Sequence, residues 1–244
     1  MAAMSSQMDP TYEELVNLFR QYDVRCNENK NKLKYDLGTV PFRKASVLIP
    51  LFYKDNELHV LLTVRTKQMP SHAGQVAFPG GMREPEDPDA IATAFREAHE
   101  EVGINRDECH VVAVLPEHGV KPHSLVSVVI ALIPNNFKPV ISPREVDLVF
   151  DLPLKRFLSG KDARTQTINF DSGMHFNAFH FYDKVDEAVV DTWGFTAHIC
   201  VMTALVTYQR QRLVIGKETI HLENCFSTDT TQAIIDLWAM KAKL

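Results

Sequence analysis

The sequence is poor in cysteine and in long apolar runs, and each shortage excludes a class of protein. Its 244 residues hold four cysteines, none in a paired spacing, so neither a thiolate zinc site nor a small disulfide scaffold is predicted. The longest apolar run, residues 125–133, is far shorter than the roughly 20 residues of a membrane-spanning helix. No basic segment followed by an apolar one is visible near the N-terminus, so neither a signal peptide nor a membrane partner is expected.

Positive charge is also scarce. The chain has 26 Lys and Arg against 31 Asp and Glu, which gives a formal net charge of −5. Residues 82–103 alone contain seven acids and two arginines, so one local concentration sets the sign of the whole chain. A chain without a basic excess has no general attraction to a phosphate backbone, and no nucleic-acid partner is expected. The 45% of apolar residues is enough for one substantial hydrophobic core.

Apolar periodicity predicts strands and helices that alternate along the chain. Strands are predicted over 45–53 and 58–65, which form a hairpin, and over 111–115, 125–133 and 175–181. Helices are predicted over 9–22, with Asp9 as its cap, and over 89–102, 193–210 and 228–241. This alternation favours a layered α/β domain with a mixed sheet. The predicted segments are an N-terminal helix and linker (1–40), a central domain (41–212) and a helical tail (213–244).

The predicted helix over 89–102 carries the residues that point to chemistry. Ideal helix geometry, with about 3.6 residues per turn, places Phe95 and Val102 on one apolar face. The opposite side carries three carboxylates, those of Glu97, Glu100 and Glu101. Two interpretations are open: an ordinary solvated face, or three acids that converge on one bound object.

The position of these acids favours a bound cation. Gly103 is typical of the residue just past a helix end, so Glu100 and Glu101 lie in the last turn, where the helix dipole disfavours a carboxylate by about 0.3–1 kcal/mol. A hard divalent cation offsets this cost and prefers oxygen ligands, so we predict Mg²⁺ or Mn²⁺. Upstream, Gly80 and Gly81 end an apolar strand, and a glycine loop packed on the helix can bring the Gly80 carbonyl oxygen beside the carboxylates.

The same segment resembles the Nudix box, a glycine followed at a distance by Arg-Glu-x-x-Glu-Glu-x-Gly and an aliphatic residue. The matching residues are Gly81 and the run Arg96-Glu97-Ala98-His99-Glu100-Glu101-Val102-Gly103-Ile104. The resemblance implies a Nudix-type α/β/α sandwich, hydrolysis of nucleoside diphosphates linked to another group, and divalent metals on the three helix glutamates. Arg96 is then expected to orient the carboxylates as an i,i+4 partner of Glu100. The spacing from Gly81 to Arg96 is one residue longer than the general box, and the first glutamate of the box has no equivalent in register, Asp87 being the nearest acid.

Further segments resemble the coenzyme A diphosphatase branch of this family. They are Leu61-Leu62-Thr63-Val64-Arg65 with Gly74-Gln75-Val76-Ala77-Phe78-Pro79-Gly80-Gly81, and later Arg144-Glu145-Val146 and Trp193-Gly194-Phe195-Thr196-Ala197. One departure is Pro70, which stands where an arginine is common. The resemblance implies cleavage of coenzyme A or acyl-coenzyme A into phosphopantetheine products and adenosine 3′,5′-bisphosphate, with Arg65, His72 and Gly81 at the substrate.

Several roles stay open at this point. Glu100 and Glu145 are both candidates for the general base, the first beside the metals and the second on a loop able to close over them. Arg65 is equally compatible with a strand-end surface arginine, and His72 with a loop histidine that has a local hydrogen bond. The competing functions are another Nudix activity, on ADP-ribose, dinucleoside polyphosphates or capped RNA, and a catalytically silent binding module. The intact glutamates argue against the silent module.

The sequence ends in Ala242-Lys243-Leu244, which differs at one position from the Ser-Lys-Leu peroxisomal address. A small residue replaces the serine. Together with the implied activity on coenzyme A, this tail predicts recognition by the peroxisomal import receptor and a location in the peroxisomal matrix. The alternative is an accidental helix end.

Overall fold

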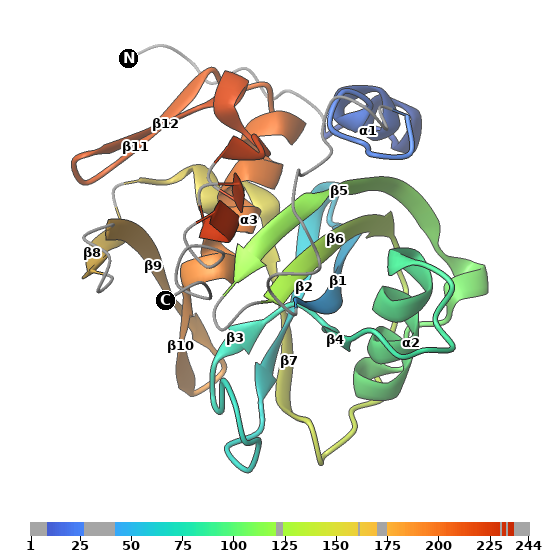
Figure 1. The fold of residues 1–244 in the computed structure, drawn as a ribbon. Coiled ribbons are helices and arrows are strands. Elements are labelled where there is room, and N and C mark those ends of the chain that lie inside the picture. Colours follow the sequence, from blue (N-terminus) through green and yellow to red (C-terminus); the bar gives the residue numbers. More distant parts are fainter. Residues whose placement is uncertain are drawn as a thin grey trace.

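The computed structural model describes residues 9–26, 42–120, 124–160, 162–169, 175–229, 231–232 and 234–236. Its helices and strands, drawn in Figure 1, follow one another along the chain. The α-helices are α1 (Tyr12–Phe19), α2 (Ala90–Val102) and α3 (Gly194–Thr207). The first seven strands are β1 (Arg43–Lys54), β2 (Glu57–Arg65), β3 (Val76–Ala77), β4 (Gly80–Met82), β5 (His110–Val120), β6 (Ser124–Leu132) and β7 (Val146–Pro153). The later strands are β8 (Ala163–Asn169), β9 (His175–Val185), β10 (Ala188–Trp193), β11 (Arg212–Ile215) and β12 (Glu218–His221), and short 3₁₀ turns cover Arg106–Glu108, Leu154–Leu158 and Leu222–Asn224.

The central sheet has seven strands and is mixed. Its path is β3-β2-β1-β6-β5, with β4 paired to β1 and β7 paired to β2. The pairing of β1 with β6 is parallel and the other pairings in this sheet are antiparallel. The predicted α/β class with a mixed sheet is therefore confirmed.

Helices cover both faces of this sheet. Successive side chains on a strand point to opposite sides, so neighbouring residues of one strand belong to two different core clusters. On β1, Leu48 belongs to the core cluster that contains the apolar side of α2. Its neighbour Ile49 belongs to the larger cluster that contains side chains of α1 and α3. Figure 1 shows α2 on one side of the sheet and α3 on the other. The three layers form the predicted α/β/α sandwich.

The hairpin predicted from residues 45–53 and 58–65 is confirmed as β1 and β2. Asp55 and Asn56 form the turn, and both have positive φ, 51° and 61°. Asn and Asp tolerate this backbone region better than other residues, and the two-residue loop pairs Lys54 with Glu57. The turn chemistry thus fixes the register in which both strands are buried on their two faces.

The other predicted elements differ mainly in length. The strands over 111–115 and 125–133 appear as the longer β5 and as β6, residues 175–181 begin β9, and the helices over 89–102 and 193–210 appear as α2 and α3. Residues 135–143 contain no helix or strand. Within the predicted helix over 228–241, the described positions 229, 231–232 and 234–236 are helical, and its end lies outside the described residues.

The start of the first helix is a correction. Asp9 was predicted as the cap, but Thr11 caps α1 and forms a capping box with Glu14. Asp9 instead contacts the central domain, where its carboxylate pairs with Lys155 Nζ at 2.5 Å and accepts a hydrogen bond from the Tyr208 hydroxyl at 3.0 Å. No helix among the described residues is both long and apolar enough to cross a membrane.

Candidate functional site

The scaffold of the site is α2, whose two ends are set by local sequence. The side chain of Asp89 caps the helix by accepting a hydrogen bond from the Ala92 amide at 2.8 Å. At the other end Gly103 has φ of 78°, in the left-handed region that glycine adopts without steric cost. Between these ends Phe95 and Val102 are buried against the sheet, as predicted. The opposite side of the helix therefore has a fixed orientation.

A loop after β6 packs on the C-terminal end of α2. The amide of Val140 donates to the Val102 carbonyl, and the amide of Ser142 donates to the Glu101 carbonyl, each at 2.9 Å. These are carbonyls that have no partner within the helix. Further along the loop, the carbonyl of Glu145 accepts a hydrogen bond from the Thr66 amide at 2.9 Å. Contacts with α2 on one side and with the end of β2 on the other thus hold Glu145 next to the helix.

The result is a cluster of three carboxylates, from Glu97, Glu101 and Glu145, with one oxygen of each lying within 4.8 Å of the others. Glu101 is buried, with 2% of its surface exposed. Glu100 lies outside this cluster: its side chain is 49% exposed, and its carboxylate faces Arg96 Nη1 at 3.4 Å. Of the three helix glutamates predicted to converge, the structure brings two together, and the third carboxylate of the group is that of Glu145.

The double glycine lies directly beneath these acids. A Cβ atom at Gly81 would overlap the carboxylate of Glu97, and one at Gly80 would overlap the Ser46 carbonyl. The backbone at Gly80 therefore packs too closely for any larger residue, whereas a side chain at Gly81 would have to displace the Glu97 carboxylate. The amide of Gly80 donates a hydrogen bond to Glu101 Oε2 at 3.2 Å. The N–H group of Gly80 thus contacts the cluster, and the role of its carbonyl oxygen beside the carboxylates stays a prediction.

The predicted substrate residues lie at different distances from the cluster. Arg65 is adjacent, with Nη1 3.4 Å from Glu101 Oε1, and its buried Nε has no hydrogen-bond partner among the residues that the structure describes. His72 is in an exposed turn, where Nδ1 lies 3.0 Å from Gln75 Oε1, which matches the local hydrogen bond weighed against a binding role. No contact of the His72 side chain with the three carboxylates is present in the part of the chain that the structure describes.

Burial disfavours the charged form of the carboxylates in this cluster. Burial raises the pKa of Glu101 to about 8; Arg65 and the Gly80 amide oppose this shift, while Glu97 and Glu145 add to it. Burial also raises the pKa of Glu97, against the effect of Arg96. Carboxylates at this separation resist carrying full charge together. A divalent cation removes that resistance, and an all-oxygen donor set of three carboxylates fits Mg²⁺ or Mn²⁺.

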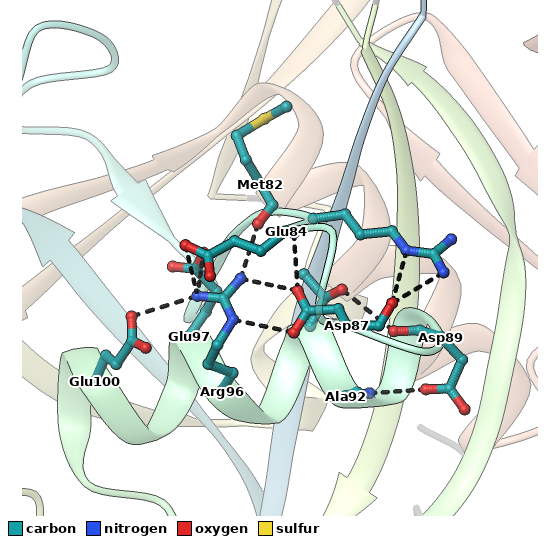
Figure 2. A network of polar contacts seen from close by, with 10 residues as sticks. Met82, Glu84, Asp87, Asp89, Ala92, Arg96, Glu97 and Glu100 are labelled. Atoms are coloured by element: carbon teal, nitrogen blue, oxygen red, sulfur yellow. Dashed lines mark hydrogen bonds and ion pairs between the residues drawn. The ribbon is translucent and has the colours of Figure 1, made fainter.

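Arg96 lies on the outer side of the cluster within a network of polar contacts (Figure 2). It contacts Glu97 Oε1 through Nη1 at 3.1 Å, and Glu100 Oε2 through the same atom at 3.4 Å. The expected i,i+4 contact with Glu100 is therefore present, together with a shorter one to Glu97. Its other N–H groups donate to both oxygens of Asp87. The sequence alone does not predict this contact of Asp87, because no local pattern links it to an arginine nine residues later.

The fold and this acidic site together define a three-layer α/β/α scaffold with a carboxylate cluster beside the helix α2. Residues 42–165, about half of the chain, match the family profile described as the NUDIX domain. The chain belongs to the Nudix family.

Three relatives illustrate the range of similar proteins. A mitochondrial Nudix hydrolase of Arabidopsis thaliana is 36% identical over 69% of this chain, and the aligned part spans 60% of that relative. The peroxisomal coenzyme A diphosphatase NUDT7 of Mus musculus is 34% identical over 72% of this chain and 77% of the relative. The peroxisomal coenzyme A diphosphatase ndx-8 of Caenorhabditis elegans is 36% identical over 74% of this chain and 77% of the relative.

Proposed function

We propose that this Nudix hydrolase cleaves the diphosphate bond of coenzyme A and its acyl derivatives, giving phosphopantetheine products and adenosine 3′,5′-bisphosphate. The observation that carries the proposal is the carboxylate cluster of Glu97, Glu101 and Glu145 above the double glycine. Two relatives named as coenzyme A diphosphatases support the substrate, as do the segments around Arg65 and Trp193 that resemble this branch.

The cluster would hold Mg²⁺ or Mn²⁺. Glu97, Glu101 and Glu145 are the carboxylates grouped closely enough to share an ion. Bound there, the ion supplies charge neutralisation at the diphosphate oxygens and a lower pKa for a coordinated water. Gly80 fixes Glu101 through its N–H group, and Gly81 leaves the space that the Glu97 carboxylate occupies.

The remaining residues bind and orient. The buried Nε of Arg65 is a donor without an acceptor among the described residues, and we assign it a phosphate oxygen of the substrate. Of the two candidate bases, Glu145 is favoured over Glu100, since Glu145 belongs to the cluster while Glu100 is exposed and paired with Arg96. His72 stays a proposed substrate contact, and its side chain lies in an exposed turn.

The decisive experiment compares turnover of coenzyme A, acetyl-coenzyme A and ADP-ribose with Mg²⁺ or Mn²⁺. Coenzyme A or its thioester is expected to have the highest kcat/KM. Glu101→Gln is expected to lower that value by on the order of 100-fold or more, since a metal ligand supplies several kcal/mol of transition-state stabilisation. The matched control is Glu86→Gln, the same chemical change at an exposed position of the preceding loop, which is expected to leave turnover unchanged.

Each competing function gives a different result. Preference for ADP-ribose, with Glu101 still required, rejects coenzyme A as the substrate and retains metal-dependent hydrolysis. Absence of turnover on all three compounds, with intact folding and nucleotide binding, identifies a catalytically silent module. Unchanged turnover in Glu101→Gln removes Glu101 from the mechanism.

We also propose a location in the peroxisomal matrix, with the import receptor as partner through Ala242-Lys243-Leu244. This tripeptide lies outside the described residues, and the support is its sequence together with the two relatives named as peroxisomal. Other relatives are named as mitochondrial or chloroplastic, so the proposal needs its own test. A fluorescent protein fused ahead of the chain is expected to label peroxisomes, and removal of residues 242–244 is expected to release it to the cytosol. Unchanged labelling would reject the tripeptide as the signal.

A further inference from the structure

The loop between β4 and α2 is held together by its own polar contacts. The amide of Glu84 donates to Asp87 Oδ2 at 3.0 Å, and the Asp87 amide donates back to the Glu84 carbonyl at 3.1 Å. Arg83 donates to the carbonyls of Asp87 and Pro88 at 2.8–3.2 Å. These contacts give the loop a closed turn that directs the carboxylate of Asp87 toward α2 (Figure 2).

Asp87 is buried, with 6% of its surface exposed, and it forms a fork with one arginine. Arg96 Nε donates to Oδ1 at 3.1 Å and Nη2 donates to Oδ2 at 3.0 Å. The guanidinium beside it holds the pKa of the Asp87 carboxyl well below its usual range. Two parallel charge-assisted hydrogen bonds fix the plane of a guanidinium as well as its position.

This fork limits how Arg96 meets the carboxylate cluster. Nε and Nη2 are taken by Asp87, and Nη2 also donates to the Met82 carbonyl at 2.9 Å. Only Nη1 is left to face Glu97, at 3.1 Å, and Glu100, at 3.4 Å. A guanidinium released from Asp87 would be free to form its own two-bond fork with Glu97, in competition with a cation for the same oxygens.

We infer that Asp87 is a positioning residue for the cation site: it holds Arg96 so that only the Nη1 nitrogen reaches Glu97, and the Glu97 carboxylate stays available to a divalent ion. Asp87 thereby secures Arg96 from the loop before α2, in a segment from Gly81 to Arg96 that is one residue longer than in the general box. The inference rests on the proposed metal-binding role of Glu97, Glu101 and Glu145, and it adds a residue that touches neither substrate nor metal.

The test measures the affinity of the full-length, metal-free protein for Mn²⁺ without substrate. Binding is monitored by the loss of the electron paramagnetic resonance signal of the free ion. Asp87→Asn keeps the size of the side chain but removes its charge and one acceptor. It is expected to weaken Mn²⁺ binding by about 10-fold or more, the range found for residues that orient metal ligands. The matched control is Asp89→Asn, which makes the same change two residues away and retains helix capping; its affinity is expected to stay within about twofold of the unmodified protein.

The Arg96→Gln variant serves as a second background for Asp87→Asn. It separates a positioning role of Asp87 from a general loss of structure. If Asp87 acts through Arg96, Asp87→Asn is expected to have no further effect on Mn²⁺ affinity once Arg96→Gln has removed the competing guanidinium. A variant that merely loosens the loop would weaken binding equally in both backgrounds. If Asp87→Asn does not fold, as judged by thermal unfolding, Asp87→Glu replaces it. That variant keeps the charge but shifts the carboxylate by one methylene, and a smaller loss that again depends on Arg96 is expected.

The outcomes are distinguishable from failure of the proposed function. Absence of Mn²⁺ binding in the unmodified protein would overturn the metal-binding role itself. Normal Mn²⁺ binding in the unmodified protein together with equal affinity in the Asp87 variants would overturn the positioning role alone. A loss that persists at full size in the Arg96→Gln background would also overturn it, because Asp87 would then act by another route.

Discussion

At the scale of single residues, Glu101 combines requirements that conflict unless a cation is present. Its carboxylate is buried, it lies near the carboxylates of Glu97 and Glu145, and the groups that oppose protonation are Arg65 and the Gly80 amide. A stable fold does not need a buried acid of this kind, since burying a charge without full compensation is costly. The conflict is typical of a functional site.

The raised pKa of Glu101 gives a prediction of how the stability of the metal-free protein depends on pH. The folded pKa of Glu101 is about 8 and its ordinary value is 4.5, so the folded state holds the proton more tightly than the unfolded state. The contribution of this group to stability is therefore fully present below pH 4.5 and is lost as the pH rises toward 8. With EDTA present, Glu101→Gln is expected to be more stable than the unmodified protein at pH 8, by on the order of a few kcal/mol, and to have a much smaller advantage at pH 5.

Urea unfolding at the two pH values measures this difference, with Glu86→Gln as the control that should follow the unmodified protein. Addition of Mn²⁺ is expected to stabilise the unmodified protein at pH 8 and to leave Glu101→Gln nearly unchanged. An equal pH dependence in both proteins would contradict the buried, proton-retaining state of Glu101.

At the scale of elements, local signals identified the helix of the site but not its partners. Asp89, the apolar face and Gly103 are all within one segment, and they predict both ends of α2. Ideal helix geometry also predicted that the carboxylates of the three helix glutamates would converge. Helix geometry contains no information on which residues pack beside each of them. Glu145 lies more than forty residues further along the chain, and a loop docked on the last carbonyls of α2 brings it in. Tertiary contacts of this kind leave no periodic pattern in the sequence.

Strands β7, β8, β10, β11 and β12 were not predicted, and β3 and β4 were predicted only as the end of an apolar strand. β8 is exposed along most of its length, so it lacks the alternation of apolar and polar residues that reveals a half-buried strand. β3 and β4 have two and three residues, too few for any periodicity. β4 is instead recognised by Gly80 and Gly81, where backbone approaches other groups closely. The glycines thus indicated a close approach, although they did not indicate which atoms approach.

At the scale of the whole molecule, α1 belongs to the main core, which its amphipathic sequence alone did not reveal. Leu15 and Phe19 are fully buried in the same cluster as the central strands and α3. The ring of Phe19 lies 6.3 Å from that of Phe226, so residues from the first and the last predicted segments meet in one core. An apolar helix face predicts that a partner exists, whereas the identity of that partner depends on the folded chain. The division of the chain into three segments stays a prediction. Within the described residues, side chains from the three segments pack in one core.

This packing predicts that α1 stabilises the entire domain. Phe19→Ala removes a fully buried aromatic side chain, and it is expected to lower the free energy of unfolding by about 3–5 kcal/mol. The control is Asn17→Ala, an exposed position on the same helix, where the change is expected to be neutral or slightly stabilising because alanine is the better helix former. Urea unfolding followed by circular dichroism measures both variants. A single cooperative transition that shifts for Phe19→Ala indicates one core, because loss of a merely appended helix would leave the midpoint of the main transition where it was.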